Sequence, residues 1–388
     1  MPNRRTFLRN TGLSVLPFVA PVIPAMARSN KLPLPPERPV SFLGDSILYD
    51  PTAYIAKLQE INATQAIKQD FYGEGGAIAA LERKFMEITG KERAMFMPTG
   101  TMANQFAILV LSGENTKVFV QETSHVFRDE ADAAQSVHNK RLIPLAKGQA
   151  GFTAEELQQS VEYHLKEEVF KSGIGAVSIE NPVRRADGKY IPFDELKKIS
   201  AYCKQQGYKL HLDGARLHLA AAWSGVSIAQ YASLFDTVYI SLYKYLGASA
   251  GAILCGDKAV MDKMTHLMKI HGGAMFSNWT NAAMALHHVE GIEGRLQQAK
   301  KKSDELFAAL NQLPELKVVV TPSGTNIHFL QPKGIDGNKM AATLAREHNI
   351  RISRVNESGL IRFTINESIL NQDLNTIVNA FRSAIKLA

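Results

Sequence analysis

Residues 209–216 read Lys-Leu-His-Leu-Asp-Gly-Ala-Arg, a short apolar strand that ends in an acid, a glycine and a base. A carboxylate at the carboxyl end of a strand, here Asp213, points into the crevice where open α/β sheets bind ligands. Residues 241–247, Ser-Leu-Tyr-Lys-Tyr-Leu-Gly, follow a later apolar strand and place Lys244 among apolar neighbours. Burial lowers the pKa of a lysine, which an amine that condenses with an aldehyde requires. Taken separately, the two residues are more simply explained as a capping aspartate and a surface lysine.

The chain around these two stretches alternates between strand and helix patterns. Segments such as 154–170 and 193–206 have helical apolar spacing with charges on the other face. This alternation predicts an α/β domain of three layers, in which one mostly parallel seven-stranded sheet is covered by helices on both faces. The strands are expected at 94–97, 118–121, 142–145, 176–180, 209–213, 237–242 and 251–255.

The pattern changes near residue 290. A large domain is predicted over residues 41–289, including an N-terminal segment, and a small C-terminal α+β domain over residues 290–388. The small domain is expected to contain helices at 295–313 and 372–386 and strands at 317–320, 326–331, 350–355 and 360–365.

The first 27 residues are typical of a twin-arginine export signal. Arg4 and Arg5 precede an apolar run over residues 13–23, which Pro17 and Pro21 interrupt, and Ala25-Met-Ala27 provides small residues for a signal peptidase. Cleavage after Ala27, a linker over residues 28–40, and a periplasmic or otherwise exported protein are therefore expected. No other contact with a membrane is predicted. This pathway carries folded proteins, which suits a protein that loads a cofactor before export.

Composition excludes several classes of protein. Hydrophobic residues make up 45% of the 388 residues and charged residues 21%, which is typical of a globular chain. The formal charge of +7 falls to +4 without the three arginines of residues 1–27. The sequence has no cluster of basic residues interleaved with aromatics, so nucleic-acid binding is not indicated. Cys203 and Cys255 lack metal-ligand spacing, so no metal is expected; both are interpreted as buried thiols, with a disulfide as the alternative.

A third stretch, Pro98-Thr-Gly-Thr101, lies between a predicted strand and a helical run over residues 102–111. Backbone N–H groups at a helix N-terminus bind anions, and glycine allows close approach, although simple capping by a threonine explains this stretch equally well in isolation. Together, an anion turn, an acid for a protonated pyridine nitrogen and a lysine for a Schiff base are what pyridoxal phosphate needs from a protein.

The order and wording of these stretches resemble the threonine aldolase and β-eliminating lyase family of fold-type I pyridoxal phosphate enzymes. The matching segments span nearly all of residues 40–388. They are residues 72–74, 98–104, 211–217, 244–251 and 269–275.

The resemblance implies a role for each matching residue. Lys244 would form the Schiff base, Asp213 would pair with the pyridine nitrogen, and Gly100 and Thr101 would bind the phosphate. His125 would stack on the cofactor ring. Arg216 would lie near the cofactor and the substrate, Arg362 would bind the substrate carboxylate, and Glu180 begins the segment that carries a family histidine.

The chain departs from the family pattern in three places. The histidine that contacts the substrate's β-hydroxyl group is replaced within Pro182-Val-Arg-Arg185, the serine before the lysine is Tyr243, and an arginine of the family is Phe276. These changes concern the substrate more than the cofactor. His271 or His125 is expected to supply the missing base, directly or through water.

The resemblance implies an aldolase that cleaves a β-hydroxy-α-amino acid, either L-threonine or a bulkier analogue, into glycine and an aldehyde. Two alternatives stay open: a β-eliminating lyase or transaminase acting on another amino acid, and an exported protein that binds the cofactor or an amino acid without turnover. The family also implies a homodimer or homotetramer.

Overall fold

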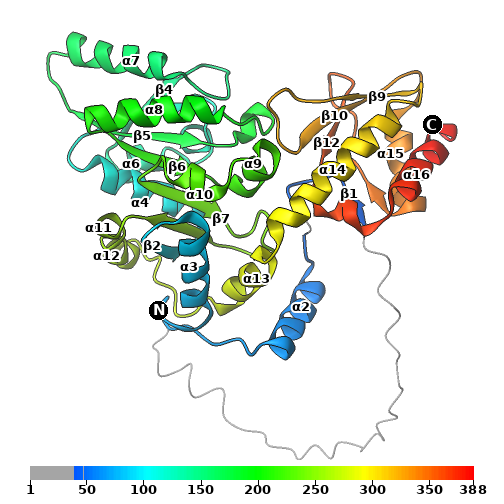
Figure 1. Cartoon of the computed structure of the whole chain (residues 1–388), viewed down its shortest axis with the longest axis horizontal. Helices are drawn as coiled ribbons and strands as arrows, with labels where there is room; N and C mark the ends of the chain where they lie inside the picture. Colours follow the sequence, from blue (N-terminus) through cyan, green and yellow to red (C-terminus); the bar gives the residue numbers. More distant parts are fainter. Residues whose placement is uncertain (1–38, 47) are drawn as a thin grey trace, which may run out of the picture. The chain divides into compact units, whose positions relative to one another are not determined.

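The computed structural model describes residues 39–46 and 48–388, so the predicted export signal lies outside the described residues. A seven-stranded sheet forms the centre of the large domain (Figure 1). Only β8 is antiparallel to its neighbours, and the other adjacent strands are parallel, which confirms the predicted fold class. In spatial order the strands are β2 (Arg93–Met97), β8 (Ala252–Gly256), β7 (Thr237–Ser241), β6 (Lys209–Asp213), β5 (Ile174–Glu180), β3 (Lys117–Gln121) and β4 (Arg141–Leu145).

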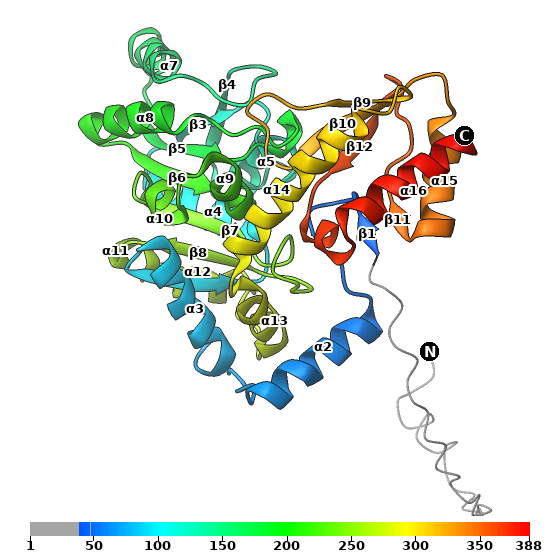
Figure 2. The same ribbon diagram turned by 45° about the vertical axis from the view of Figure 1, so that its right-hand side comes forward.

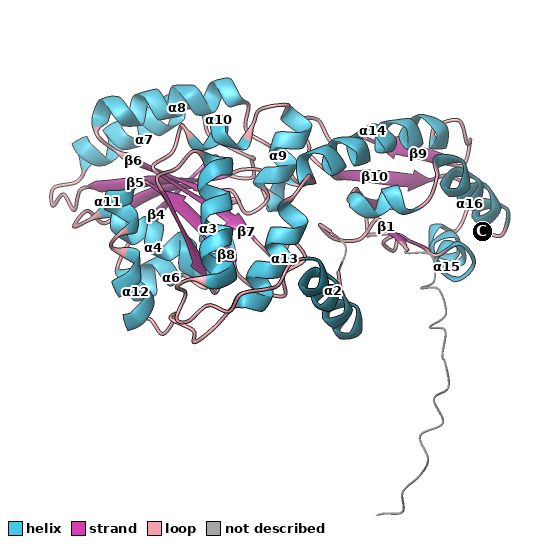
Figure 3. Ribbon diagram, turned by 60° about the horizontal axis from the view of Figure 1, so that its bottom comes forward, coloured by secondary structure: helices cyan, strands magenta, loops and turns pink. Residues whose placement is uncertain are grey.

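Helices cover both faces of this sheet (Figure 3). One face carries α4 (Gly100–Ser112), and the other carries α3 (Gly76–Thr89), α7 (Ala154–Glu167), α8 (Phe193–Gln206) and α10 (Ile228–Ala232). Because strand side chains alternate in direction, Leu210 and Leu212 of β6 pack in the core with α8, whereas His211 and Asp213 contact α4. The same alternation therefore builds the core and places polar groups beneath one helix.

The remaining helices of the large domain connect these layers or lie at its edges. The polypeptide forms a capping box at the start of α7, where Thr153 and Glu156 satisfy each other's backbone N–H groups. The additional helices are α2 (Pro51–Thr64), α5 (His125–Arg128), α6 (Ala133–His138), η1 (Arg184–Ala186), α9 (Leu217–Ser224), α11 (Lys258–Met261), α12 (Met264–Ile270) and α13 (Trp279–Val289).

The small domain is built on a three-stranded antiparallel sheet. Its central strand, β10 (Ile327–Pro332), pairs with β9 (Leu316–Val319) and β12 (Ile361–Thr364). The long helix α14 (Ile292–Leu310) contacts both α9 of the large domain and elements of the small domain (Figure 2). The other small-domain helices are α15 (Gly337–His348), η2 (Glu367–Asn371) and α16 (Leu374–Lys386).

Three details of the small domain differ from the sequence prediction. The strand expected at 350–355 is only β11 (Ile350–Arg351), which pairs with β1 (Val40–Ser41) and not with the three-stranded sheet. Val40, assigned to the linker, and Phe42, assigned to the large domain, are buried in the small-domain core, where the Phe42 ring stacks on Phe363 at 4.1 Å. Helix α15 was not predicted.

Two further observations concern the described residues. Cys203 and Cys255 are both buried and unpaired, which confirms the prediction of buried thiols. Among residues 39–46 and 48–388, no helix combines the length and apolar character needed to span a bilayer.

Candidate active site

Six of the eight predicted site residues meet at the carboxyl edge of the central sheet. The strand register aligns Glu180 at the end of β5 with Asp213 at the end of β6, and Asp213 with Tyr239 of β7. Lys244 follows β7 by three residues, and α4 begins at Gly100, three residues after β2 ends. A crevice at this edge is where open α/β sheets place their ligands.

A pocket of about 340 Å³ opens at this edge. Its lining includes six of the eight catalytic, cofactor-binding and substrate-binding residues predicted from the sequence: Gly100, Thr101, His125, Asp213, Arg216 and Lys244. The other lining residues are Pro98, Thr99, Glu130, Glu180, Ala215, Tyr239, Tyr243, Ser249, Ala250 and Gly251.

Lys244 supplies the nucleophilic amine of the pocket. Burial, together with the nearby Arg216 cation, lowers the pKa of Lys244 from an ordinary value of 10.5 to about 8. Its neighbours Leu242 and Tyr245 are buried, which explains the apolar surroundings seen in the sequence. The neutral amine, the form that attacks a carbonyl carbon, is therefore far more populated near neutral pH than it is in an ordinary lysine.

Asp213 is buried beneath α4 and held by a fixed network. Its carboxylate accepts hydrogen bonds from Asn104 Nδ2 at 3.0 Å and from the backbone N–H of Ala215 at 3.1 Å. Burial lowers the pKa of His211 to about 4, so this histidine is neutral; its Nε2 lies 2.9 Å from Asn104 Oδ1, and its Nδ1 lies 2.9 Å from Thr237 Oγ1. Because Asn104 Oδ1 accepts a hydrogen bond from His211, the amide hydrogens on Asn104 Nδ2 remain to be donated to carboxylates. The hydrogen bond from Nδ2 fixes the orientation of Asp213.

His125 is attached to the same network through Glu130. Its Nδ1 lies 2.9 Å from Glu130 Oε1, which also accepts from Asn104 Nδ2 at 2.7 Å. The hydrogen bond to Glu130 raises the pKa of His125 above its ordinary value. Because Nδ1 is engaged, Nε2 is the nitrogen of His125 that remains for a ligand.

Glu180 connects His125 to the segment after β5. Its carboxylate accepts from the backbone N–H groups of His125 at 2.7 Å and of Arg184 at 2.9 Å. Burial, together with the nearby charge of Asp213, raises the pKa of Glu180 to about 7. Glu180 therefore positions backbone on two sides of the pocket.

The turn at Gly100 is both a helix cap and an approach to the pocket. Thr99 Oγ1 accepts from the backbone N–H of Met102 at 3.2 Å, which confirms the capping interpretation, while Gly100 and Thr101 line the pocket at the positive end of the α4 dipole. A Cβ at Gly100 would lie 2.1 Å from Tyr239 Oη, so only glycine fits. The cap therefore leaves Gly100 and Thr101 at the pocket, and their binding of a phosphate stays a prediction.

A second turn, Ser249 to Gly251, also lines the pocket. Asn281 Oδ1 of α13 accepts from the backbone N–H of Ser249 at 3.1 Å, from Ser249 Oγ at 2.9 Å and from the backbone N–H of Ala250 at 3.2 Å. The sequence indicated this turn as part of a family segment but gave no sign of its support by Asn281. Only the packing of α13 reveals it.

Arg216 is buried and already paired. Its Nε and Nη2 contact the two carboxylate oxygens of Asp45 at 3.1 and 2.8 Å. Asp45 belongs to the N-terminal segment, far from Arg216 in sequence, and sequence analysis did not identify it. Arg216 thus fixes the N-terminal segment beside the pocket, in addition to lining it.

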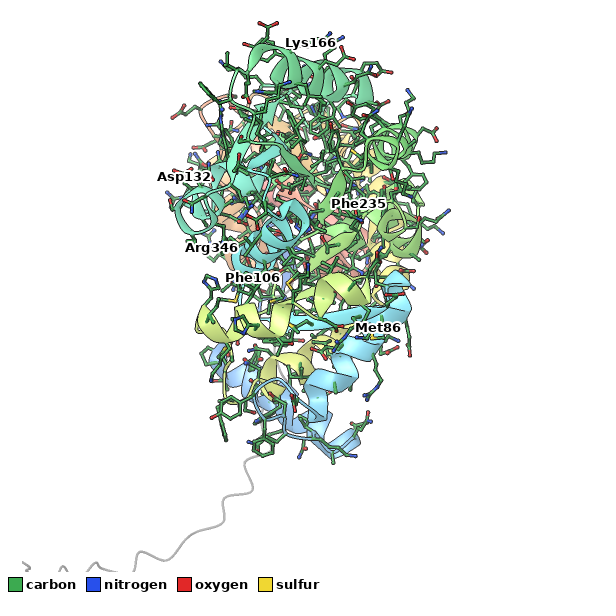
Figure 4. The ribbon with its side chains drawn as sticks, turned by 90° about the vertical axis from the view of Figure 1, so that its left-hand side faces the viewer. Met86, Phe106, Asp132, Lys166, Phe235 and Arg346 are labelled. Carbon is green, nitrogen blue, oxygen red and sulfur yellow. The ribbon has the colours of Figure 1, made fainter. Side chains whose placement is uncertain are left out.

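The structure does not place Arg362 or His271 among the pocket-lining residues. Arg362 Nη1 donates to Asp187 Oδ1 at 2.9 Å, and both side chains are half-exposed. The His271 ring lies 5.2 Å from the ring of Phe106, which Figure 4 labels, and 5.1 Å from His138. His271 is thus on the α12 side of α4, and in this chain His125 is the histidine that lines the pocket.

The three departures from the family pattern have different surroundings. Val183 is buried and carries no titratable group, so the segment after β5 offers no imidazole. Tyr243 lines the pocket, and the Lys244 ammonium lies 5.6 Å from its ring centre. Phe276 is exposed and packs edge-on against Phe71 and Tyr72.

One cluster of possible metal ligands lies in the pocket. Donor atoms of His125, Glu130 and Asp213 all lie within 4.8 Å of one another. Hydrogen bonds to each other and to Asn104 already engage these side chains, which explains their proximity without an ion.

The residues present fit pyridoxal phosphate. The pocket combines a lysine of lowered pKa, a buried carboxylate held by an amide, and a helix N-terminus where glycine permits close approach. These groups match the aldehyde, the pyridine nitrogen and the phosphate of that cofactor. The fold and the pocket together define a fold-type I pyridoxal phosphate enzyme.

Comparison with known proteins identifies the family. The sequence model of the β-eliminating lyase family matches residues 42–334, and the chain belongs to that family. Low-specificity L-threonine aldolases of Candida albicans and Saccharomyces cerevisiae are 29% and 30% identical over 306 and 286 residues; these alignments cover 78% and 73% of this chain and 80% and 72% of the relatives.

The fold is similar to that of a solved structure. A protein of Exiguobacterium sp. 255-15, provisionally named an aromatic amino acid β-eliminating lyase/threonine aldolase, superposes with a TM-score of 0.75. It is 26% identical, and the match covers 91% of this chain and 98% of that chain.

Proposed function

We propose that this chain is a pyridoxal phosphate-dependent carbon–carbon lyase that cleaves a β-hydroxy-α-amino acid into glycine and an aldehyde. The observation that carries the proposal is the pocket itself, in which Lys244, with a pKa of about 8, lies with Asp213 and the N-terminus of α4. Relatives named L-threonine aldolases support the same reaction.

Each pocket residue has a task in this reaction. Lys244 Nζ would attach the cofactor, Asp213 would hold its protonated ring nitrogen, and Gly100 and Thr101 would hold its phosphate. When bound, the cofactor supplies an acceptor for the electron pair left on Cα as the Cα–Cβ bond breaks. Asp213 is suited to its task because Asn104 and the backbone of Ala215 hold the carboxylate in place.

The proton of the β-hydroxyl group needs an acceptor. His125 Nε2 is placed for this step because Nδ1 is held by Glu130, and Val183 excludes an imidazole in the segment after β5. As this proton moves to Nε2, the Cα–Cβ bond breaks and the β-carbon leaves as an aldehyde. Arg362 would bind the substrate carboxylate through the guanidinium nitrogens that Asp187 does not engage.

Product analysis tests this proposal. The purified protein, loaded with pyridoxal phosphate, is incubated with L-threonine, L-allo-threonine and phenylserine. Glycine and the matching aldehyde in equal amounts are expected. A keto acid with ammonia would instead indicate β-elimination, a keto acid without ammonia would indicate transamination, and a bound cofactor with no product would indicate a binding protein.

The spectrum of the loaded protein gives a second test that needs no side chain to leave. Glycine can lose a Cα proton but has no β-carbon, so its addition reports the amino-acid site and Cα chemistry alone. A change in the visible absorbance on adding glycine is expected. An unchanged spectrum would favour the alternative activities.

We also propose that the protein is a homodimer or homotetramer. None of the residues of α2 is buried, and the apolar side chain of Ile55 in this helix is exposed. The aromatic side chains of Phe71, Tyr72 and Phe276 are exposed as well. Exposed apolar groups of this kind are typical of an interface between subunits. Light scattering of the purified protein should give two or four times the mass of the chain.

Export through the twin-arginine pathway is likewise proposed, and it rests on residues 1–27 alone. Fractionation of cells that express the full chain should find it outside the cytoplasm. Replacing Arg4 and Arg5 together with lysine preserves the charge and should retain the protein inside; an unchanged distribution would contradict the proposal.

A further inference from the structure

Three arginines lie in the segment after β5 or contact it: Arg184, Arg185 and Arg362. Within residues 39–46 and 48–388, only Arg184 has a side chain without a hydrogen-bond or ion-pair partner. Its side chain is exposed and makes no hydrogen bond or ion pair there, whereas Arg185 contacts both oxygens of Asp129 at 2.9 and 2.5 Å. Arg362, which reaches this segment from β12, is paired with Asp187. Of these three arginines, only Arg184 makes no direct contact with an aspartate. The hydrogen bond from Arg185 lowers the pKa of Asp129, and the charge of Arg184 adds to this effect at longer range.

Arg184 is held at the edge of the pocket. Its backbone N–H donates to Glu180 Oε1 at 2.9 Å, and Glu180 lines the pocket. Burial raises the pKa of the pocket-lining Tyr243, and the positive charges of Arg216 and, more weakly, of Arg184 oppose this rise. Arg184 itself is not one of the lining residues, but its exposed side chain extends from backbone that is bonded to a pocket-lining carboxylate.

The carboxylates of the pocket do not need Arg184. Glu130 accepts from His125 and Asn104, Asp213 accepts from Asn104 and a backbone N–H, and Glu180 accepts from two backbone N–H groups. The segment is also held from the small-domain side, since the backbone oxygen of Gly188 accepts from the backbone N–H and Oγ1 of Thr325 at 3.0 and 2.8 Å. Arg184 is therefore carried on fixed backbone, and among the described residues its guanidinium makes no direct contact with a carboxylate.

From this arrangement we infer that the preferred substrate is a β-hydroxy-α-amino acid whose side chain ends in an anionic group, which Arg184 binds. The inference rests on the proposed function, in which Arg362 takes the α-carboxylate. The simplest such substrate is 3-hydroxyaspartate. Its Cα–Cβ bond breaks, the β-hydroxyl proton passes to the enzyme, the β-carbon leaves as the aldehyde of glyoxylate, and protonation of Cα gives glycine.

The test compares isosteric substrates on the loaded enzyme. Both diastereomers of 3-hydroxyaspartate are measured beside 3-hydroxyasparagine, in which a neutral amide replaces the side-chain carboxylate, and beside threonine. The wild-type kcat/KM should be at least about tenfold higher for the acid than for the amide, because a hydrogen bond between charged groups is stronger than one to a neutral group. High salt should reduce this preference, since Arg184 is exposed.

Arg184→Gln should remove the preference for the acid over the amide, and the matched control Arg185→Gln, at an adjacent arginine already paired with Asp129, should keep it. An equal loss on all substrates in Arg184→Gln would overturn the inference, because it would assign Arg184 to the α-carboxylate. Loss of cofactor absorbance in that variant would overturn it as well, because it would assign Arg184 to the phosphate. Cleavage of threonine without cleavage of 3-hydroxyaspartate would refute the inference alone, whereas no cleavage of any substrate would refute the proposed function.

Discussion

The lowered pKa of Lys244 makes the rate of cofactor capture depend on pH in a defined way. At pH 7 a lysine with a pKa of about 8 is neutral in about 9% of molecules, whereas a lysine at the ordinary 10.5 is neutral in about 0.03%, which is a difference of about 300-fold. Only the neutral amine attacks an aldehyde. Burial of Lys244 should therefore accelerate capture of the cofactor near neutral pH by a factor of this order.

The assay follows the visible absorbance of the apoprotein after mixing with pyridoxal phosphate between pH 6 and pH 10. Because the pKa is lowered, the neutral fraction of Lys244 increases about tenfold per pH unit below pH 8 and levels off above it. The rate should follow this curve. The same reaction with N-acetyl-lysine, an amine with an ordinary pKa, corrects for the titration of the cofactor itself.

The variant Asp213→Asn tests the effect of the Asp213 charge on the pKa of Lys244. The negative charge of Asp213 raises the pKa of Lys244 and so opposes the effect of burial. The isosteric change Asp213→Asn should consequently move the break in the rate profile to lower pH. A wild-type rate that continues to increase about tenfold per pH unit up to pH 10, or a break that does not move in Asp213→Asn, would refute the electrostatic reasoning.

Three other substitutions test the remaining parts of the site. Lys244→Ala should abolish both turnover and the visible absorbance of the bound cofactor, and a variant that stays active would contradict its assignment. Asp213→Ala should keep part of the cofactor but lose at least about 100-fold in kcat/KM, since it removes the charge opposite the ring nitrogen; unchanged kinetics would exclude that role. Asn281→Ala removes the acceptor of three hydrogen bonds to Ser249 and Ala250, so denaturant titration should show a loss of about 1–3 kcal/mol, together with weaker cofactor binding; if neither changes, Asn281 does not support this turn.

The architecture of the large domain is predictable from sequence patterns alone. All seven strands lie within one or two residues of their predicted positions, because a buried parallel strand is a short apolar run that contrasts with amphipathic helices. Sequence patterns also predicted the six site residues that line the pocket, since each follows a strand whose carboxyl end faces the same edge.

Contacts between segments that are distant in the sequence are not predictable from local patterns. Asp45 forms an ion pair with Arg216, and Asn281 supports the turn at Ser249. Val40 and Phe42 pack in the small-domain core, although most of the sequence separates them from the residues that they contact there. The same holds for His271, which packs beside Phe106 on the α12 side of α4, and for Arg184, whose lack of a partner is visible only once Asp129 and Asp187 are paired with other arginines. Local sequence patterns predict strands, helix caps and turns because these depend on neighbouring residues. The partner of a charged or polar side chain depends on how distant segments pack in three dimensions.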